Sequence, residues 1–268
     1  MPKTNKPTLI AASIVVASLG GASSALTFAP GSDVALSDNF VLGPTSPGKW
    51  GTPTMGTGAD VTYSFMGAGL GTLGGVPSVD LSTFMPAGYE QEIAAAFDAW
   101  AAVADISFAE VTDPDVDWRS ASAVKSDIRI AGVDIDGPRR VLARSFFPPR
   151  NGGGAAGDVL FDSSENWKIG FEGAGFDIFQ IAAHEIGHSI GLGHECGDTG
   201  RDRPCEVALM NPFYTESFRG LQPDDIAGAQ AIYGAGAVAP VSLPAGLPLM
   251  GGGLALLGGL GLRRRAAA

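Results

Sequence analysis

All three histidines of this 268-residue chain fall within one stretch, HEIGHSIGLGH, from His184 to His194. Histidines used only for packing would be spread along the chain, so this clustering indicates a shared ligand. His184 and His188 stand four residues apart and would lie one above the other on a helix, where both imidazoles can reach one metal ion. Gly191 would end that helix and allow a sharp turn that returns His194 as a third ligand. The spacing therefore predicts a zinc site.

Three protein ligands leave the fourth position of a tetrahedral zinc ion open for water, which distinguishes a catalytic site from a structural one. Glu185 would point about 100° around the helix axis from His184, close enough to act on the water without being a ligand. Zinc lowers the pKa of its bound water to about 7, and Glu185 can take the proton during attack on a carbonyl. The motif predicts peptide hydrolysis with Glu185 as general base. The alternative is a surface helix whose histidines bind nothing.

The composition limits the partners of the chain. A net charge of −11 argues against nucleic acid or an anionic membrane surface. With 45% hydrophobic residues the chain can bury a real core, and its length leaves room for one catalytic-sized domain with short flanks.

Residues 1–25 have the order of a secretory signal peptide. Lys3 and Lys6 precede an apolar run from Leu9 to Leu19, and small residues follow as far as Ala25. A buried N-terminal helix is the alternative interpretation. We expect a secreted protein, with residues 26–47 as an N-terminal linker.

The C-terminal end of the chain also has an unusual composition. A Gly/Leu-rich apolar run from Leu247 to Leu262 stands directly before Arg263, Arg264 and Arg265, and it is slightly shorter than the roughly 20 residues that span a bilayer. The segment resembles bacterial C-terminal sorting signals of the PEP-CTERM kind, with VSLPA at 241–245 close to the VPLPA variant. That resemblance implies a linker at 235–245 and a membrane or sorting segment at 246–268, which a membrane protease removes at the outer cell surface. A helix packed on the domain is the alternative, and it fits poorly with so many glycines.

Between these ends the hydrophobic pattern alternates between helices and strands. Period-two and short apolar runs predict strands, and the run at 141–147 is expected at a sheet edge because two prolines follow it. Apolar residues at helical spacing predict three helices. The predicted strands are 60–66, 106–111, 127–131, 141–147 and the run that begins at 159, and the predicted helices are 89–104, 176–190 and 223–233.

The zinc motif is followed by ALMNPFY at 208–214, and together the two stretches resemble the metzincin proteases, in particular the matrixins. The resemblance covers residues 48–234. It implies an α+β fold: a twisted mixed sheet with one antiparallel edge strand, three helices, and an active-site cleft between upper and lower subdomains. It also implies that Met210 lies beneath the metal and that Pro212 and Tyr214 form the wall of the primed-side pocket. A peptide or protein substrate is expected to bind extended along Leu142 and Ala143.

The matrixin resemblance also implies further metals. Asp136, Gly137, Asp162 and Glu165 match calcium ligands of the family, with Asp158 assigned to another site, and hard carboxylate oxygens suit calcium. Solvated acidic loops are the alternative. The histidines that hold a second, structural zinc in matrixins are replaced by Arg144 and Leu160, so we expect one zinc ion only.

The two cysteines, Cys196 and Cys205, flank the loop between His194 and Met210. In a secreted chain with only two cysteines, a disulfide between them is the first interpretation. The second makes Cys196 a zinc ligand, but a fourth protein ligand would close the site and remove the catalytic water.

The sequence thus predicts a monomeric, secreted zinc endopeptidase. The main alternative is a surface or matrix protein that binds zinc without catalysis, and a complete ligand set beside Glu185 argues against it because a binding module needs no general base. An intermediate possibility is a protease that cleaves only its own chain.

Overall fold

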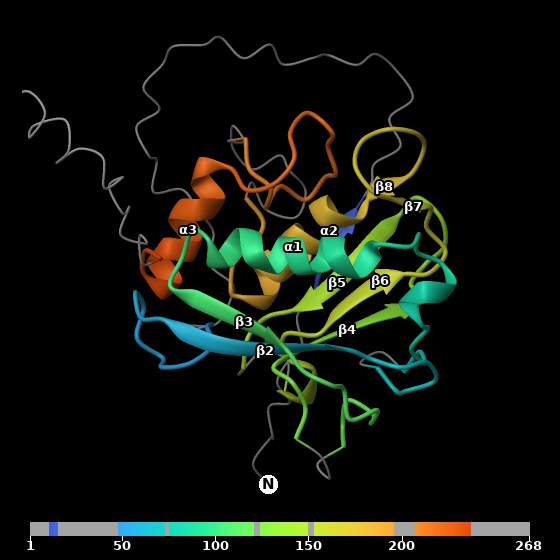
Figure 1. Cartoon of the computed structure of the whole chain (residues 1–268), viewed down its shortest axis with the longest axis horizontal. Coiled ribbons are helices and arrows are strands. Elements are labelled where there is room, and N and C mark those ends of the chain that lie inside the picture. The colour runs from blue at the N-terminus through green and yellow to red at the C-terminus, as the bar shows by residue number, and fades with distance from the viewer. Residues whose placement is uncertain are drawn as a thin grey trace, which may run out of the picture. The chain divides into compact units, whose positions relative to one another are not determined.

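The computed structural model describes residues 11–15, 48–72, 75–120, 124–149, 153–195 and 207–236. Within these residues a six-stranded mixed sheet is covered on one face by helices α1 and α2 (Figure 1). The strands are β1 (Ala11–Val15), β2 (Ala59–Phe65), β3 (Ile106–Glu110), β4 (Ile128–Val133), β5 (Val141–Phe146), β6 (Val159–Asp162), β7 (Trp167–Lys168) and β8 (Phe176–Asp177). The helices are α1 (Tyr89–Ala101), α2 (Ile178–Ser189) and α3 (Pro223–Tyr233), with two short 3₁₀ turns at Leu81–Thr83 and Gly153–Ala155.

The strand order is β1-β5-β6-β4-β2-β3, and a separate pair joins β7 to β8. Strands β6, β4, β2 and β3 run parallel to their neighbours, whereas β5 is antiparallel to β6. This confirms the predicted mixed sheet with an antiparallel strand among parallel ones. One detail differs from the sequence prediction: β1 pairs with the outer side of β5, so β5 is not a free edge in the full chain.

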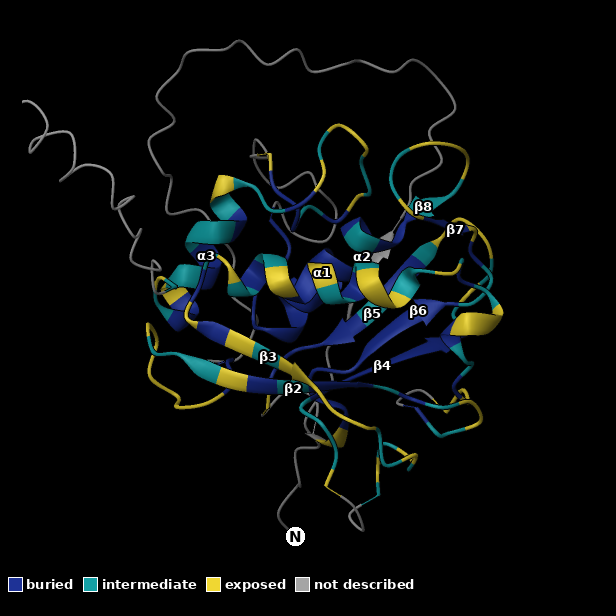
Figure 2. Cartoon of the chain, viewed as in Figure 1, coloured by how far each residue is buried: buried dark blue, intermediate teal, exposed yellow. Residues whose placement is uncertain are grey.

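The two central strands are buried at every position, and Figure 2 shows β4 and β6 dark blue along their length. Parallel strands covered on both faces are expected to be apolar throughout rather than alternating. β3 is the edge strand at the end of the sheet opposite β1, and it has one buried residue, Ile106, followed by exposed and half-buried ones. The core therefore lies between the middle of the sheet and the helices.

Helix α1 forms where the sequence places apolar residues on one face, and Ile93, Phe97 and Trp100 are fully buried as the spacing predicts. The Trp100 indole Nε1 donates a hydrogen bond of 2.9 Å to the carbonyl of Ala183 in α2. This contact joins α1 to the helix that carries the zinc motif, because a buried indole N–H needs an acceptor.

Several predictions concern residues outside the described ranges. These are the signal peptide apart from residues 11–15, the linker at 26–47, residues 237–245 of the second linker, the segment at 246–268 and both cysteines, Cys196 and Cys205. Among the described residues, none of the helices is both long enough and apolar enough to cross a membrane.

Candidate metal centre

Helix α2 carries two of the three histidines, and both of its ends are fixed by specific contacts. At the start, the side chain of Asp177 caps the helix by accepting a hydrogen bond of 2.9 Å from the Gln180 amide. At the end, Gly191 adopts a left-handed φ of 115°. A side chain at Gly191 would place its Cβ 2.2 Å from the carbonyl oxygen of Gly48, so glycine is required there. The predicted helix stop and turn are confirmed.

The turn brings the three histidines together. Their ligand atoms lie within 4.8 Å of one another, and they form the one such group of three or more His, Cys, Asp or Glu side chains among the described residues. His184, His188 and His194 are all buried. The distances between ring centroids are 4.7 Å for His184–His188, 5.3 Å for His184–His194 and 4.7 Å for His188–His194.

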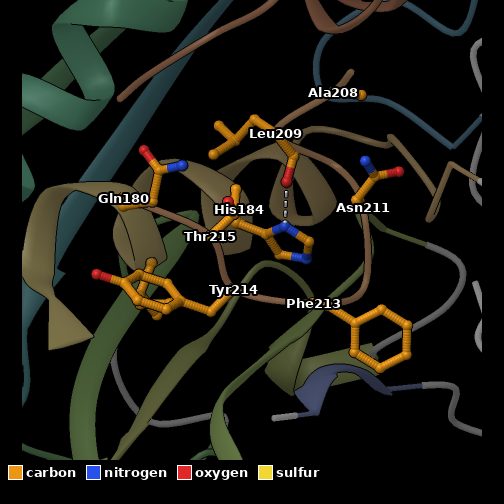
Figure 3. A pocket seen from close by; sticks show the side chains of 9 residues that line it. Gln180, His184, Ala208, Leu209, Asn211, Phe213, Tyr214 and Thr215 are labelled. Atoms are coloured by element: carbon orange, nitrogen blue, oxygen red, sulfur yellow. Dashed lines mark hydrogen bonds between the residues drawn. The ribbon is translucent and has the colours of Figure 1, made fainter. Parts of the chain in front are cut away.

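Backbone carbonyls orient two of the imidazole rings. Nδ1 of His184 lies 2.7 Å from the Leu209 oxygen, as Figure 3 shows, and Nδ1 of His188 lies 2.7 Å from the Leu192 oxygen. Each Nδ1 must donate its proton to the carbonyl, which leaves the lone pair on Nε2. The Nε2 atoms of His184 and His188 are buried without a hydrogen-bond partner among the described residues. Burial lowers the pKa of His184 to about 3 and that of His188 well below its usual value, so both rings are neutral. Neutral, oriented imidazoles with open Nε2 atoms fit a zinc ion.

Glu185 lies beside this cluster but is not a member of it. Its side chain is fully buried, and its Oε2 accepts a hydrogen bond of 2.6 Å from Ser145 Oγ on β5. Its Oε1 is buried and has no hydrogen-bond partner in the described part of the chain. Burial raises the pKa of Glu185 to about 8, while the Ser145 hydrogen bond and the charge of Arg144 act in the opposite direction. A cation on the histidines would also lower this pKa.

Met210 packs against α2 at Gly187. A Cβ on Gly187 would lie 2.4 Å from the Met210 sulfur, so the turn and the helix are in direct contact. The buried carboxylate of Asp225, near the start of α3, accepts hydrogen bonds from the amides of Leu209 at 2.7 Å and Met210 at 3.0 Å. Helix α3 thereby holds the turn whose Leu209 carbonyl orients His184.

A narrow pocket opens beside His184 (Figure 3). Its volume is about 10 Å³, roughly the room that one water molecule needs. Tyr214 lines it, whereas Pro212 is buried and is not among the lining residues. The lining residues are Gln180, Ile181, His184, Ala208, Leu209, Asn211, Phe213, Tyr214 and Thr215.

Sequence reasoning missed Gln180 and Arg219, although both organise this pocket. Gln180 is buried, and its Oε1 accepts a hydrogen bond of 2.8 Å from the Gly220 amide. Its position one helical turn before His184, on the same face, was the available signal. Arg219 bonds Asp177 Oδ1 at 2.9 Å and also pairs with Glu92 of α1. The loop that closes the pocket is therefore tied to the capped end of α2.

The predicted calcium residues separate into two places. Asp136, Asp162 and Glu165 belong to neighbouring loops, although their carboxylate oxygens do not all come within 4.8 Å of one another as the histidine ligand atoms do. Asp162 Oδ2 accepts a 3.3 Å hydrogen bond from the Asp136 amide, and Glu165 Oε1 accepts from the Arg139 and Arg140 amides. Gly137 allows the turn between them with a φ of 86°. Burial raises the pKa of Glu165, and the two aspartates raise it further.

Asp158 is not part of that loop. It is buried near Arg129, and burial raises its pKa to about 7. Its assignment to a different site stays a prediction.

Arg144 and Leu160, which stand where matrixins carry histidines, face each other in the β5–β6 register. Leu160 belongs to a small apolar cluster with Met66, Ala131, Val133, Phe146 and Ala155. A guanidinium cannot ligate a metal, and apolar side chains offer no ligand atom. The pair is therefore unsuited to the structural zinc.

The strand predicted to pair with substrate carries Leu142 and Ala143, both buried. In the full chain, β1 runs antiparallel along this strand, with Ser13 opposite Arg144 and Val15 opposite Val141. The outer side of β5 is thus able to take a strand.

Comparison with known proteins agrees with this geometry. The chain is 35% identical over 153 residues to karilysin of Tannerella forsythia, 37% over 161 residues to stromelysin-3 of Mus musculus, and 40% over 148 residues to interstitial collagenase of Bos taurus. These matches cover 54%, 57% and 54% of this chain and 28% of the length of each relative. The model of the matrixin family, Peptidase_M10, matches residues 79–234, which include the three histidines, Glu185 and Met210, and the chain therefore belongs to the matrixin family.

Proposed function

We propose that the protein is a secreted zinc-dependent endopeptidase in which Glu185 is the general base. The observation that carries this proposal is the convergence of three histidine ligand atoms within 4.8 Å, next to a buried carboxylate that is not one of them. Zinc bound there supplies a Lewis acid and lowers the pKa of its water to about 7. A zinc-binding module would need the ligands but not the carboxylate, so the buried Glu185 favours the enzyme over the adhesive surface protein.

Glu185 moves the proton in this proposal. Its Oε2 is held by Ser145, so Oε1 is the atom that accepts a proton from the attacking water and returns it to the amine that leaves. His184 and His188 stay neutral and oriented because backbone carbonyls accept their Nδ1 protons.

The substrate would bind as an extended strand along β5, past Leu142 and Ala143. The antiparallel pairing of Ala11–Val15 with this strand supports that mode, because backbone hydrogen bonds alone can hold a peptide of varied sequence there. Since β1 lies within the predicted signal peptide, removal of residues 1–25 would leave the outer side of β5 open to substrate. We propose that a sorting protease removes the segment at 246–268 in a similar step at the cell surface.

The mechanism predicts that Glu185→Gln loses peptide hydrolysis and keeps zinc. General acid–base catalysis contributes roughly 10²- to 10⁴-fold, so kcat/KM should fall by at least about 100-fold, measured with a fluorogenic peptide library. Zinc content by elemental analysis should match the wild type. Glu90→Gln, at an exposed position of α1, is the control and should retain activity. Loss of zinc from Glu185→Gln would show that Glu185 is a ligand.

The metal site predicts one zinc ion per chain. Because Arg144 and Leu160 offer no ligands at the second position, elemental analysis of the purified domain should give a single zinc. His188→Ala should lower both zinc affinity and activity, and His194→Ala should weaken that same single site. Two tightly held zinc ions per monomer would contradict this prediction.

The carboxylates of Asp136, Asp162 and Glu165 predict a structural calcium ion, since they repel one another without a cation. Calcium removal, with zinc held constant, should lower the melting temperature by about 5–10 °C relative to calcium at roughly 100 times its dissociation constant. Asp136→Asn should reduce this dependence, whereas Asp134→Asn, at an exposed position two residues away, should not. If the melting temperature does not change when calcium is removed, these residues form solvated acidic loops and not a calcium site.

The narrow pocket predicts a preference for small side chains at the residue after the cleaved bond. Gln180→Ala would remove buried volume at the pocket and the hydrogen bond to Gly220. The ratio of kcat/KM for a peptide with Phe to one with Ala at that residue should rise by about 10-fold. Gln230→Ala is the control, because Gln230 bonds Val103 and does not line the pocket. An unchanged ratio would show that Gln180 does not limit the pocket.

A further inference from the structure

The hydroxyl of Ser145 is the one side-chain donor to the Glu185 carboxylate among the described residues. Ser145 Oγ lies 2.6 Å from Glu185 Oε2, and both side chains are fully buried. A hydroxyl bonded to a carboxylate at this distance makes a short, charge-assisted hydrogen bond. The contact links two elements far apart in the sequence, strand β5 and helix α2.

Because of this hydrogen bond, the two oxygens of the Glu185 carboxylate have different surroundings. Oε2 is occupied by Ser145, while Oε1 has no hydrogen-bond partner in the described part of the chain. A carboxylate held through one oxygen cannot rotate freely about its terminal torsion, which is otherwise broad and two-fold. The unoccupied oxygen therefore keeps a fixed position.

The main chain of Ser145 lies in the strand along which a peptide would bind. Its partner in the register is Val159 on one side and Ala12 of β1 on the other. A substrate that pairs with the outer side of β5 would then contact the residue whose side chain holds Glu185. The same residue joins the peptide-binding strand to the general base.

We propose that Ser145 is a positioning residue for the reaction, which fixes Glu185 through Oε2 and so presents Oε1 to the attacking water. The inference rests on the proposed function, because it concerns the orientation of the base assigned there. It adds a requirement that the metal motif does not contain. In this protein, loss of the Ser145 hydroxyl would slow the reaction even with the three histidines and Glu185 in place.

Ser189 provides a matched control within the same helix. It is also fully buried, and its Oγ donates to the carbonyls of Gly157 at 2.9 Å and Glu185 at 3.1 Å. Ser189→Ala therefore removes a buried hydroxyl next to Glu185 without touching the carboxylate. Any loss that comes from burial or packing alone should be common to both alanine variants.

The experiment compares wild type, Ser145→Ala, Ser145→Thr and Ser189→Ala, each as the mature zinc-loaded protein. Hydrogen bonds to charged groups of this kind correspond to a change of about 10- to 100-fold, so kcat of Ser145→Ala should fall by that factor with KM unchanged. Ser145→Thr, which keeps the hydroxyl, should recover most of kcat. Zinc affinity, from competition with a chromogenic chelator, and melting temperature should match those of Ser189→Ala.

Three results would overturn the inference. The first is a kcat for Ser145→Ala equal to that of Ser189→Ala. The second is a loss of kcat in Ser145→Ala that lower zinc affinity or a lower melting temperature explains. The third is a Ser145→Thr variant that folds and binds zinc but stays as slow as Ser145→Ala. A wild type that binds zinc yet cleaves no peptide would instead refute the proposed function, so the two failures are distinguishable.

Discussion

The structure depends on the burial of helix α2 together with its polar side chains. His184, Glu185 and His188 are almost completely removed from solvent. A neutral polar group left without a partner in such a place costs about 1–3 kcal/mol, and an ionised group costs more. The surrounding chain meets this cost with specific partners: the carbonyls of Leu209 and Leu192 for the rings, and the Ser145 hydroxyl for the carboxylate. The atoms left over are the ones that a metal ion and a water molecule would use.

The partners of α2 come from elements that must be positioned themselves. The Leu209 carbonyl belongs to a turn that Asp225 holds through two amides, and Asp225 stands in the first turn of α3. The Leu192 carbonyl follows the Gly191 turn, where a side chain would collide with Gly48. The orientation of two imidazoles thus rests on contacts from the start and the end of the domain.

Local patterns were sufficient to predict much of this structure. Helical spacing predicted α1, α2 and α3, and the i, i+4 pair with a glycine and a third histidine predicted the metal group, because each depends on residues close in sequence. Ser145 and Gln180 were not predicted as functional residues. Their roles depend on partners across the fold, Glu185 for the first and Gly220 for the second, and a single sequence does not specify such pairs. The pairing of β1 with β5 was missed for a related reason, because its apolar run matched a signal peptide and contained no indication of register.

Asp177 shows how the pocket and the metal group are coupled through one helix end. Its side chain caps α2 and pairs with Arg219, while its amide donates to the Tyr214 hydroxyl. Arg219 also stacks on the Phe179 ring and pairs with Glu92 of α1. The loop that limits the pocket is therefore fixed to the first turn of the helix whose second and third turns carry the histidines. A change of this loop that broke the Arg219 pair would leave the buried Asp177 carboxylate without its counter-charge, with only the Gln180 and Gly170 amides still donating to it. The pocket can consequently vary in its lining residues, such as Phe213 and Thr215, more freely than in the residues that tether it.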